Sequence, residues 1–271
     1  MVAGLLVDMN QPTRRTEDPA LPTLPPRRWP RVLRRGGLAL LGLFAAYVAL
    51  VIHPQPLFAY SARRANVVLH ARAPFPPEVQ PLLTEVVRRV SRSPLYDPQR
   101  RHDVFLCDTP ALFAFFEPIQ PRVGGVAQWQ LGGNVFIRPF DIVHGTVIGP
   151  SGVAKGGERT LTYFVAHEVT HAMTAAHLGR WRYGHLAAFQ AEGYADYVAF
   201  DHRVDFAAGR DALLRDAPEM DPKRSGLYAR YELLVAHLLE RRGLTADQLL
   251  ARPLDRRAVE DELLAASAVA P

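Results

Sequence analysis

The residues best suited to chemistry form one short motif, His-Glu-Val-Thr-His at residues 167–171. Side chains four residues apart on an α-helix lie above one another, so His167 and His171 can offer two imidazoles to one metal ion. Glu168 lies one step round the helix, beside such an ion but not on it, where a general base for a metal-activated water belongs. The motif therefore predicts metal-dependent hydrolysis.

A catalytic zinc site has three protein ligands and one open position, so a third ligand must come from elsewhere. Twenty residues separate Glu192 from His171, enough for a loop and re-entry on a second helix. Asp196 projects from the same face of that helix and could accept the free N–H of a ligand histidine. The alternative ligand is His177, which points about 120° away from His171 on an unbroken helix. It could bind only after a sharp turn at Thr174, a residue poorly suited to a left-handed conformation, so we favour Glu192.

Residues 167–171, followed by Glu-Gly-Tyr-Ala-Asp at 192–196, resemble the gluzincins, the thermolysin-like zinc metallopeptidases. The resemblance covers about residues 160–200, with a looser likeness in the helices beyond. It implies one zinc ion bound by His167, His171 and Glu192. It also implies that Glu168 is the base and proton shuttle, and that Asp196 supports a ligand histidine.

The spacing of His177 resembles that of the metzincins instead, but the glycine that their motif requires is absent. Met220 could be compared with the methionine of their conserved turn, yet its Pro-Glu-Met-Asp-Pro context is only a loop signal. The residues therefore favour the gluzincin comparison.

Hydrolysis also needs a hydrogen-bond donor for the developing oxyanion. Spacing alone does not select this donor, and ordinary packing is the alternative for each candidate. The candidates are Tyr183, His185, Tyr228, Tyr231 and His237. Two tryptophans, Trp129 and Trp181, are predicted to pack rather than to bind substrate.

The elements around the motif predict an α+β fold with a zincin-like catalytic domain. One helix is expected over residues 160–178, ended by Gly179. Before it, strands are expected at 66–69 and 102–107, with helices at 77–92 and 109–117. Residues 125–131 and 134–139 flank a Gly-Gly turn and predict a hairpin. After it, helices are expected at 206–215, 226–241, 245–251 and 256–266.

Residues 134–138 are the candidate for an edge strand, which would pair with an extended peptide in the resembled fold. Edge pairing has a physical basis, because an edge strand has unused N–H and C=O groups. An internal strand is the alternative. The sequence leaves both open.

The N-terminal region predicts a membrane anchor. Residues 1–35 are rich in proline and arginine and are expected to form a disordered, basic cytoplasmic tail. Residues 36–52 contain no charge and form a candidate transmembrane helix, preceded by a cluster of arginines that favours a cytoplasmic N-terminus. Retention as an anchor is favoured over cleavage near Ala59. Residues 53–271 would then form the catalytic domain outside the cytoplasm, in the periplasm or exterior.

Composition narrows the class of protein. The chain is 48% hydrophobic and 22% charged, which is typical of a globular protein. Residues 1–52 hold seven arginines and three acidic residues, a net +4 of the total +5, so the rest has no basic stripe for nucleic acid. The single cysteine, Cys107, allows no internal disulfide and is expected to be a buried, inert thiol.

The sequence thus predicts a membrane-anchored zinc peptidase of the cell membrane, acting on peptide or protein substrates. Two other functions remain open. One is a membrane-tethered zinc amidohydrolase that acts on non-peptide material. The other is a non-catalytic binding protein with a vestigial metal site, which the presence of Glu168 disfavours because a structural site does not need it.

Overall fold

The computed structural model describes residues 29–154 and 157–266. The chain divides into two compact units, Met1–Ala46 and Tyr47–Pro271. Helix α1 (Trp29–Ile52) contains Leu33–Ile52, a stretch of 20 residues with a mean hydropathy of 1.9, long and apolar enough to cross a membrane. Residues 29–35 are helical, so the predicted tail is wrong there, and its residues 1–28 lie outside the described part.

The second unit begins inside helix α1, not after it. Val51 is only 2% exposed and packs in a cluster of aromatic residues with Cys107. The Asn134 side chain donates hydrogen bonds to the carbonyls of Val51 and Ile52, at 3.0 and 2.9 Å, which supplies partners that the end of a helix lacks. The Tyr47 hydroxyl donates to the Phe115 carbonyl at 3.0 Å. The predicted domain start at residue 53 is therefore too late.

A five-stranded mixed sheet forms one layer of this unit, which confirms the predicted α+β architecture. Its strand order is β1-β2-β3-β5-β4. The central strands β2, β3 and β5 are parallel, and the outer strands β1 and β4 run antiparallel to their neighbours. The strands are β1 (Tyr60–Arg64), β2 (Val67–Ala71), β3 (His102–Leu106), β4 (Gly125–Ala127) and β5 (Val135–Ile137). Helix α2 (Val79–Val90) connects β2 to β3, and α3 (Pro110–Phe116) follows β3.

The predicted hairpin exists, with shorter strands and a longer loop than expected. β4 pairs antiparallel with β5, and Gly132 and Gly133 in the loop have φ values of 144° and 86°. The proposed edge position of residues 134–138 is wrong. β4 folds back outside β5, so β5 is internal and the edge beside the helical layer is β4.

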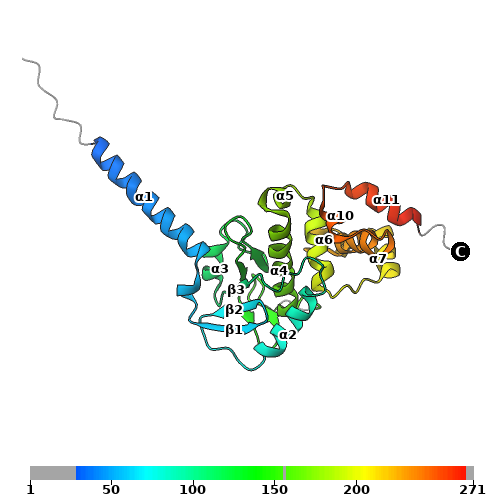
Figure 1. Ribbon diagram of the computed structural model, residues 1–271, viewed down its shortest axis with the longest axis horizontal. Coiled ribbons are helices and arrows are strands. Elements are labelled where there is room, and N and C mark those ends of the chain that lie inside the picture. Colours follow the sequence, from blue (N-terminus) through cyan, green and yellow to red (C-terminus); the bar gives the residue numbers. More distant parts are fainter. Residues whose placement is uncertain (1–28, 155–156, 267–271) are drawn as a thin grey trace, which may run out of the picture. The chain divides into compact units, whose positions relative to one another are not determined.

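Helix α4 (Leu161–Leu178) is the centre of the second unit (Figure 1). The Thr160 side chain caps it by accepting from the Tyr163 N–H at 3.2 Å, and Gly179 ends it with a φ of 79°. It contacts β3, β4 and β5 on one side and helices α2 and α6 (Ala188–Ala199) on others. Every residue from 163 to 175 is buried. The prediction of this helix is confirmed.

The rest of the second unit is mostly helical. Gly193 lets α6 approach helix α9 (Ala229–Ala236) closely, because a Cβ at this position would lie 2.3 Å from the Tyr231 carbonyl oxygen. The predicted helix 226–241 begins at Ala229 and ends in a π-helical turn, His237–Arg241. The remaining elements are η1 (Gln55–Leu57), β6 (Phe140–Asp141), β7 (Thr146–Val147), α5 (Arg180–Gly184), α7 (Phe206–Leu214), η2 (Pro218–Met220), α8 (Pro222–Ser225), α10 (Ala246–Leu250) and α11 (Arg256–Ala266).

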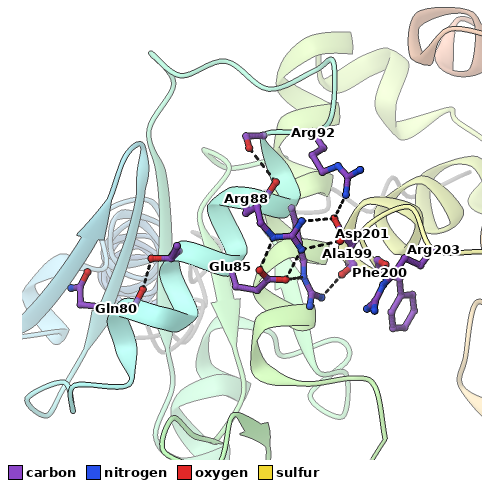
Figure 2. Close-up of polar contacts among 11 residues, drawn as sticks. Gln80, Glu85, Arg88, Arg92, Ala199, Phe200, Asp201 and Arg203 are labelled. Atoms are coloured by element: carbon purple, nitrogen blue, oxygen red, sulfur yellow. Dashed lines mark hydrogen bonds and ion pairs between the residues drawn. The ribbon is translucent and has the colours of Figure 1, made fainter.

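A charged network joins α2 to the C-terminal end of α6 (Figure 2). Arg88 and Arg92 donate to the Asp201 carboxylate at 2.9 and 2.6 Å, and Arg89 donates to the Ala199 carbonyl. Partial burial alone raises the pKa of Asp201, but the hydrogen bonds from both arginines outweigh it and lower the pKa to about 2. Asp201 also has a φ of 64°, a conformation that asparagine and aspartate tolerate.

Asp201→Asn should lower the free energy of unfolding by about 1 kcal/mol at pH 7, because asparagine keeps the backbone conformation but loses the charge. A carboxyl with a lowered folded pKa stabilises above its unfolded pKa of about 4 and stops doing so as pH falls towards 2. The difference between variant and wild type should therefore shrink over that range in denaturant titrations. Asp211→Asn, which breaks an exposed pair with Arg215, should have no measurable effect. Equal effects of the two variants at pH 7 would contradict the assignment.

Candidate metal centre

Three side chains converge at the crossing of α4 and α6. The Nε2 atoms of His167 and His171 lie 3.1 Å apart, and the Oε2 atom of Glu192 lies 3.4 and 3.5 Å from them. A tetrahedral ion with bonds of about 2.0–2.1 Å holds its ligand atoms about 3.4 Å from one another. The three atoms therefore have the spacing of one face of a tetrahedral metal site.

The two candidate third ligands lie in different surroundings. Glu192 joins the histidines, and all three potential ligand atoms lie within 4.8 Å of one another. The Nε2 atom of His177 instead lies 2.6 Å from the Asp247 carboxylate, on a side chain that is 41% exposed. Met220 packs with alanines in a separate small cluster. The geometry thus favours the set that the gluzincin resemblance implies.

Asp196 orients the first histidine. Its Oδ1 atom lies 2.8 Å from Nδ1 of His167 and accepts a hydrogen bond of 2.5 Å from the Tyr163 hydroxyl. When the imidazole of His167 is neutral, its proton lies on Nδ1 toward this carboxylate, and the lone pair of Nε2 faces the triad. Asp196 is 1% exposed, and Arg159 lies 4.0 Å from its Oδ2 atom.

Tyr183 orients the second histidine in the same way. Its hydroxyl lies 2.7 Å from Nδ1 of His171 and can accept that proton. Trp129 packs edge-on against the Tyr183 ring, with the centroids 5.1 Å apart, and also lines the cleft that opens onto the triad. This geometry favours Tyr183 as a partner of His171 over a role as oxyanion donor. Trp181, in contrast, is 78% exposed, so its prediction as a packing residue is wrong.

The electrostatics of the triad favour a positive charge at its centre. Burial lowers the pKa of His167, but the hydrogen bonds to Asp196 and Glu192 outweigh it and raise the pKa to about 10. Burial raises the pKa of Glu192, but His171 and His167 outweigh it and hold the pKa below the usual range of a carboxyl. A proton on the imidazole or a metal cation in its place can supply this charge.

Glu168 lies between the triad and the edge strand β4. It is 7% exposed, and burial raises its pKa above the ordinary value, against the lowering effect of the two histidines and of a backbone hydrogen bond from Ala127. A Cβ at Gly125 would lie 2.7 Å from the Glu168 side chain, so this glycine makes room for it. Glu168 is therefore beside the triad and held against β4.

A cleft of about 880 Å³ opens onto the triad. It is lined by β4 and the segments on both sides of it (residues 116–131), by Arg159 and by Tyr228. The Tyr228 ring is stacked on His167, with centroids 6.3 Å apart and an interplanar angle of 7°. No hydrogen bond is assigned to its hydroxyl among the described residues. Among the predicted oxyanion donors in the described part of the chain, Tyr228 is the one that lines the cleft with a hydroxyl that makes no hydrogen bond to another residue.

The other candidate donors lie away from the triad. Tyr231 stacks on Tyr228, 5.8 Å between centroids, but is not among the described residues that line the cleft. His185 bonds to the Trp181 carbonyl at 2.7 Å, and His237 is paired with Glu262 at 3.4 Å. Each of these three residues therefore contacts groups other than the triad.

Sequence reasoning missed two residues at the centre. Tyr163 precedes His167 by four positions, so helical spacing alone puts it on the same face of α4. Arg159 lies just before the helix and contacts the rings of Tyr163 and Tyr228, 5.3 and 5.9 Å from their centroids. Only the fold reveals the role of Arg159, because Tyr228 is distant in sequence.

Comparisons with protein-family models, with curated proteins and with solved structures find no match. The gluzincin resemblance therefore depends on residues 167–171 and 192–196 alone. The case for a function depends on the geometry of the centre.

The full-length protein in detergent should bind one zinc ion per chain, as measured by elemental analysis after gel filtration. His171→Ala and Glu192→Ala should each abolish stoichiometric binding, because two ligands do not complete the site. His177→Ala should retain the metal, since His177 pairs with Asp247. Loss of zinc in His177→Ala but not in Glu192→Ala would reverse the assignment of the third ligand.

Proposed function

We propose that this protein is a membrane-anchored, zinc-dependent peptidase. The observation that carries the proposal is the triad of His167, His171 and Glu192 at tetrahedral spacing, with Glu168 beside it and a cleft in front. A structural metal site is closed by a fourth protein ligand and needs no adjacent base. A buried carboxylate next to three ligands and facing a cleft is what hydrolysis requires.

Zinc, when bound, would polarise the scissile carbonyl and lower the pKa of the attacking water. Glu168 then removes a proton from the attacking water as its oxygen bonds to the carbonyl carbon. The same carboxyl passes that proton to the nitrogen as the C–N bond breaks, which releases an amine and a carboxylic acid. The position of Glu168 supports both proton transfers. Gly125 has no side chain, which lets Glu168 pack against β4 and remain beside the triad.

Tyr228 is the proposed donor to the developing oxyanion. Its ring lies over His167 on the cleft side, and its hydroxyl has no assigned partner in the described chain. Burial, and to a smaller extent the negative charge of Glu192, raises the pKa of Tyr228 above the ordinary value. The phenol therefore keeps its proton at neutral pH. A neutral hydroxyl can donate a hydrogen bond to a negatively charged oxygen.

The cleft suits an extended peptide. Strand β4 is the edge of the sheet, pairs with β5 on one side only, and lines the cleft with residues 125–127. An edge strand has free N–H and C=O groups that can bond to a peptide backbone irrespective of its side chains. This supports a polypeptide substrate over a small amide.

The proposed anchor is Leu33–Ile52. Arginines 27, 28, 31, 34 and 35 precede or begin this stretch. Positive charges remain on the cytoplasmic side of bacterial and eukaryotic membranes, so the second unit would face away from the cytoplasm.

Glu168→Gln should lower peptide turnover by about 10³-fold, because an amide of the same shape cannot take up the proton of the water. The assay is cleavage of a library of internally quenched fluorescent peptides by the full-length protein in detergent. Zinc content of the variant should stay at the wild-type level, which separates lost chemistry from lost folding. Turnover equal to that of the wild type would refute the proposed function.

Tyr228→Phe should lower kcat by about 100-fold with a smaller change in KM, because a donor used in the transition state is removed. Tyr231→Phe is the matched control, a stacked neighbour in the same segment that does not line the cleft. Equal kcat values for the two variants would assign the oxyanion to another donor.

A further inference from the structure

The cleft that faces the triad shares a wall with the proposed membrane span. Tyr47 and Val51 of α1 line the same cleft as His167 and Glu168. Both belong to the second unit, which begins at Tyr47. Both also belong to Leu33–Ile52, the stretch apolar enough to cross a membrane. The end of the span is therefore part of the cleft.

The length of the span determines how deep these residues lie. A bilayer core of about 30 Å takes about 20 helical residues at 1.5 Å each. The apolar stretch has 20 residues, which is the length that such a core takes. Its last six residues, from Tyr47, then lie at the outer boundary of the hydrocarbon. Three of these six bond to other parts of the second unit: Tyr47 to the Phe115 carbonyl, and Val51 and Ile52 to the Asn134 side chain.

Large apolar side chains are exposed next to this boundary. Phe115 packs edge-on against Tyr47, with centroids 5.2 Å apart, and is 38% exposed. Ile119 and Leu131 line the cleft and are 85% and 38% exposed. Arg122 lines it as well and is exposed. A mixture of apolar side chains with a tyrosine and an arginine suits the interface between lipid tails and headgroups.

We infer that the cleft opens at the membrane surface, and that the substrates of the centre are polypeptide segments lying at that surface. This inference rests on the proposed peptidase function and deepens it. It commits Ile119 and Leu131 of the cleft, and Phe115 beside Tyr47, to contact with lipid. It also predicts that the rate of cleavage depends on the distance between the scissile bond and the bilayer.

The distance can be bounded. A domain of this size has a radius of gyration of about 17 Å. Ten extended residues reach about 33 Å. A scissile bond a few residues from the lipid therefore reaches a cleft on the near side, whereas a cleft on the far side needs a longer spacer.

The first test measures depth and needs no activity. Cys107 is fully buried, and burial raises the pKa of its thiol, so a nitroxide label will attach to an introduced cysteine. Ile119→Cys and Leu214→Cys are a matched pair of exposed apolar positions, the second on α7. In the full-length protein in lipid vesicles, the label at 119 should be accessible to oxygen and shielded from a water-soluble nickel complex. The label at 214 should behave as in water. A label at 119 that behaves as in water overturns the inference.

The second test uses the same vesicles with a quenched fluorescent peptide, one that the soluble library identifies as cleaved, attached to a lipid. Spacers of about 3, 10 and 25 residues separate the scissile bond from the lipid. Cleavage should be at least about tenfold faster with the shortest spacer than with the longest, after subtraction of the Glu168→Gln blank. Equal rates, or rates that rise with spacer length, overturn the inference.

The two proposals fail in different ways. If the wild type cleaves neither soluble nor tethered peptides, the peptidase function fails, and the inferred substrates fail with it. The depth of the label at residue 119 then decides separately whether the cleft opens at the membrane surface.

Discussion

The second unit depends on one constraint: His167, His171 and Asp196 are buried, and Glu192 is half-buried, where α4 crosses α6. Buried charged groups need partners, because an unpaired charge in the interior is strongly destabilising. Asp196 accepts from His167 and Tyr163, and Tyr183 accepts from His171, so both imidazoles turn Nε2 toward Glu192. Helix α4 packs against the sheet, α2 and α6, which prevents it from rotating to relieve a mismatch. The orientation of the imidazoles follows from this packing.

Elements outside the crossing of α4 and α6 hold these two helices in place. Gly193, next to Glu192, permits the close approach of α9 behind α6, and Gly125 permits the approach of β4 to Glu168. At the far end of α6, the arginines of α2 bind Asp201 and the Ala199 carbonyl. Helix α6 therefore carries the candidate ligand Glu192 and is bound by the arginines of α2 at its C-terminal end.

Local patterns in the sequence were sufficient for α4, its end at Gly179 and the His167–His171 pair, since four-residue spacing is a property of one helix. The convergence of Glu192 with the two histidines was also predicted, from the requirement for a third ligand. Whether residues 134–138 form an edge strand or an internal one was left open, because strand order depends on where β4 folds back and not on the composition of β5. The partnership of Tyr183 with His171 was missed for a similar reason: its contact with Nδ1 follows from the turn after Gly179. Contacts between distant segments were the common failure.

The contact between Asn134 and the end of α1 has a consequence for modularity. Hydropathy would divide this chain at about residue 52, into an anchor and an interchangeable body. The carbonyls of Val51 and Ile52 bond to that body, and the Val51 side chain completes an aromatic cluster on Phe58, Phe105 and Phe136. Exchange of the whole apolar stretch, residues 33–52, for an unrelated one would remove part of the core. The last turns of α1 are therefore part of the second unit, and any chimera must keep the native sequence from Tyr47 onward.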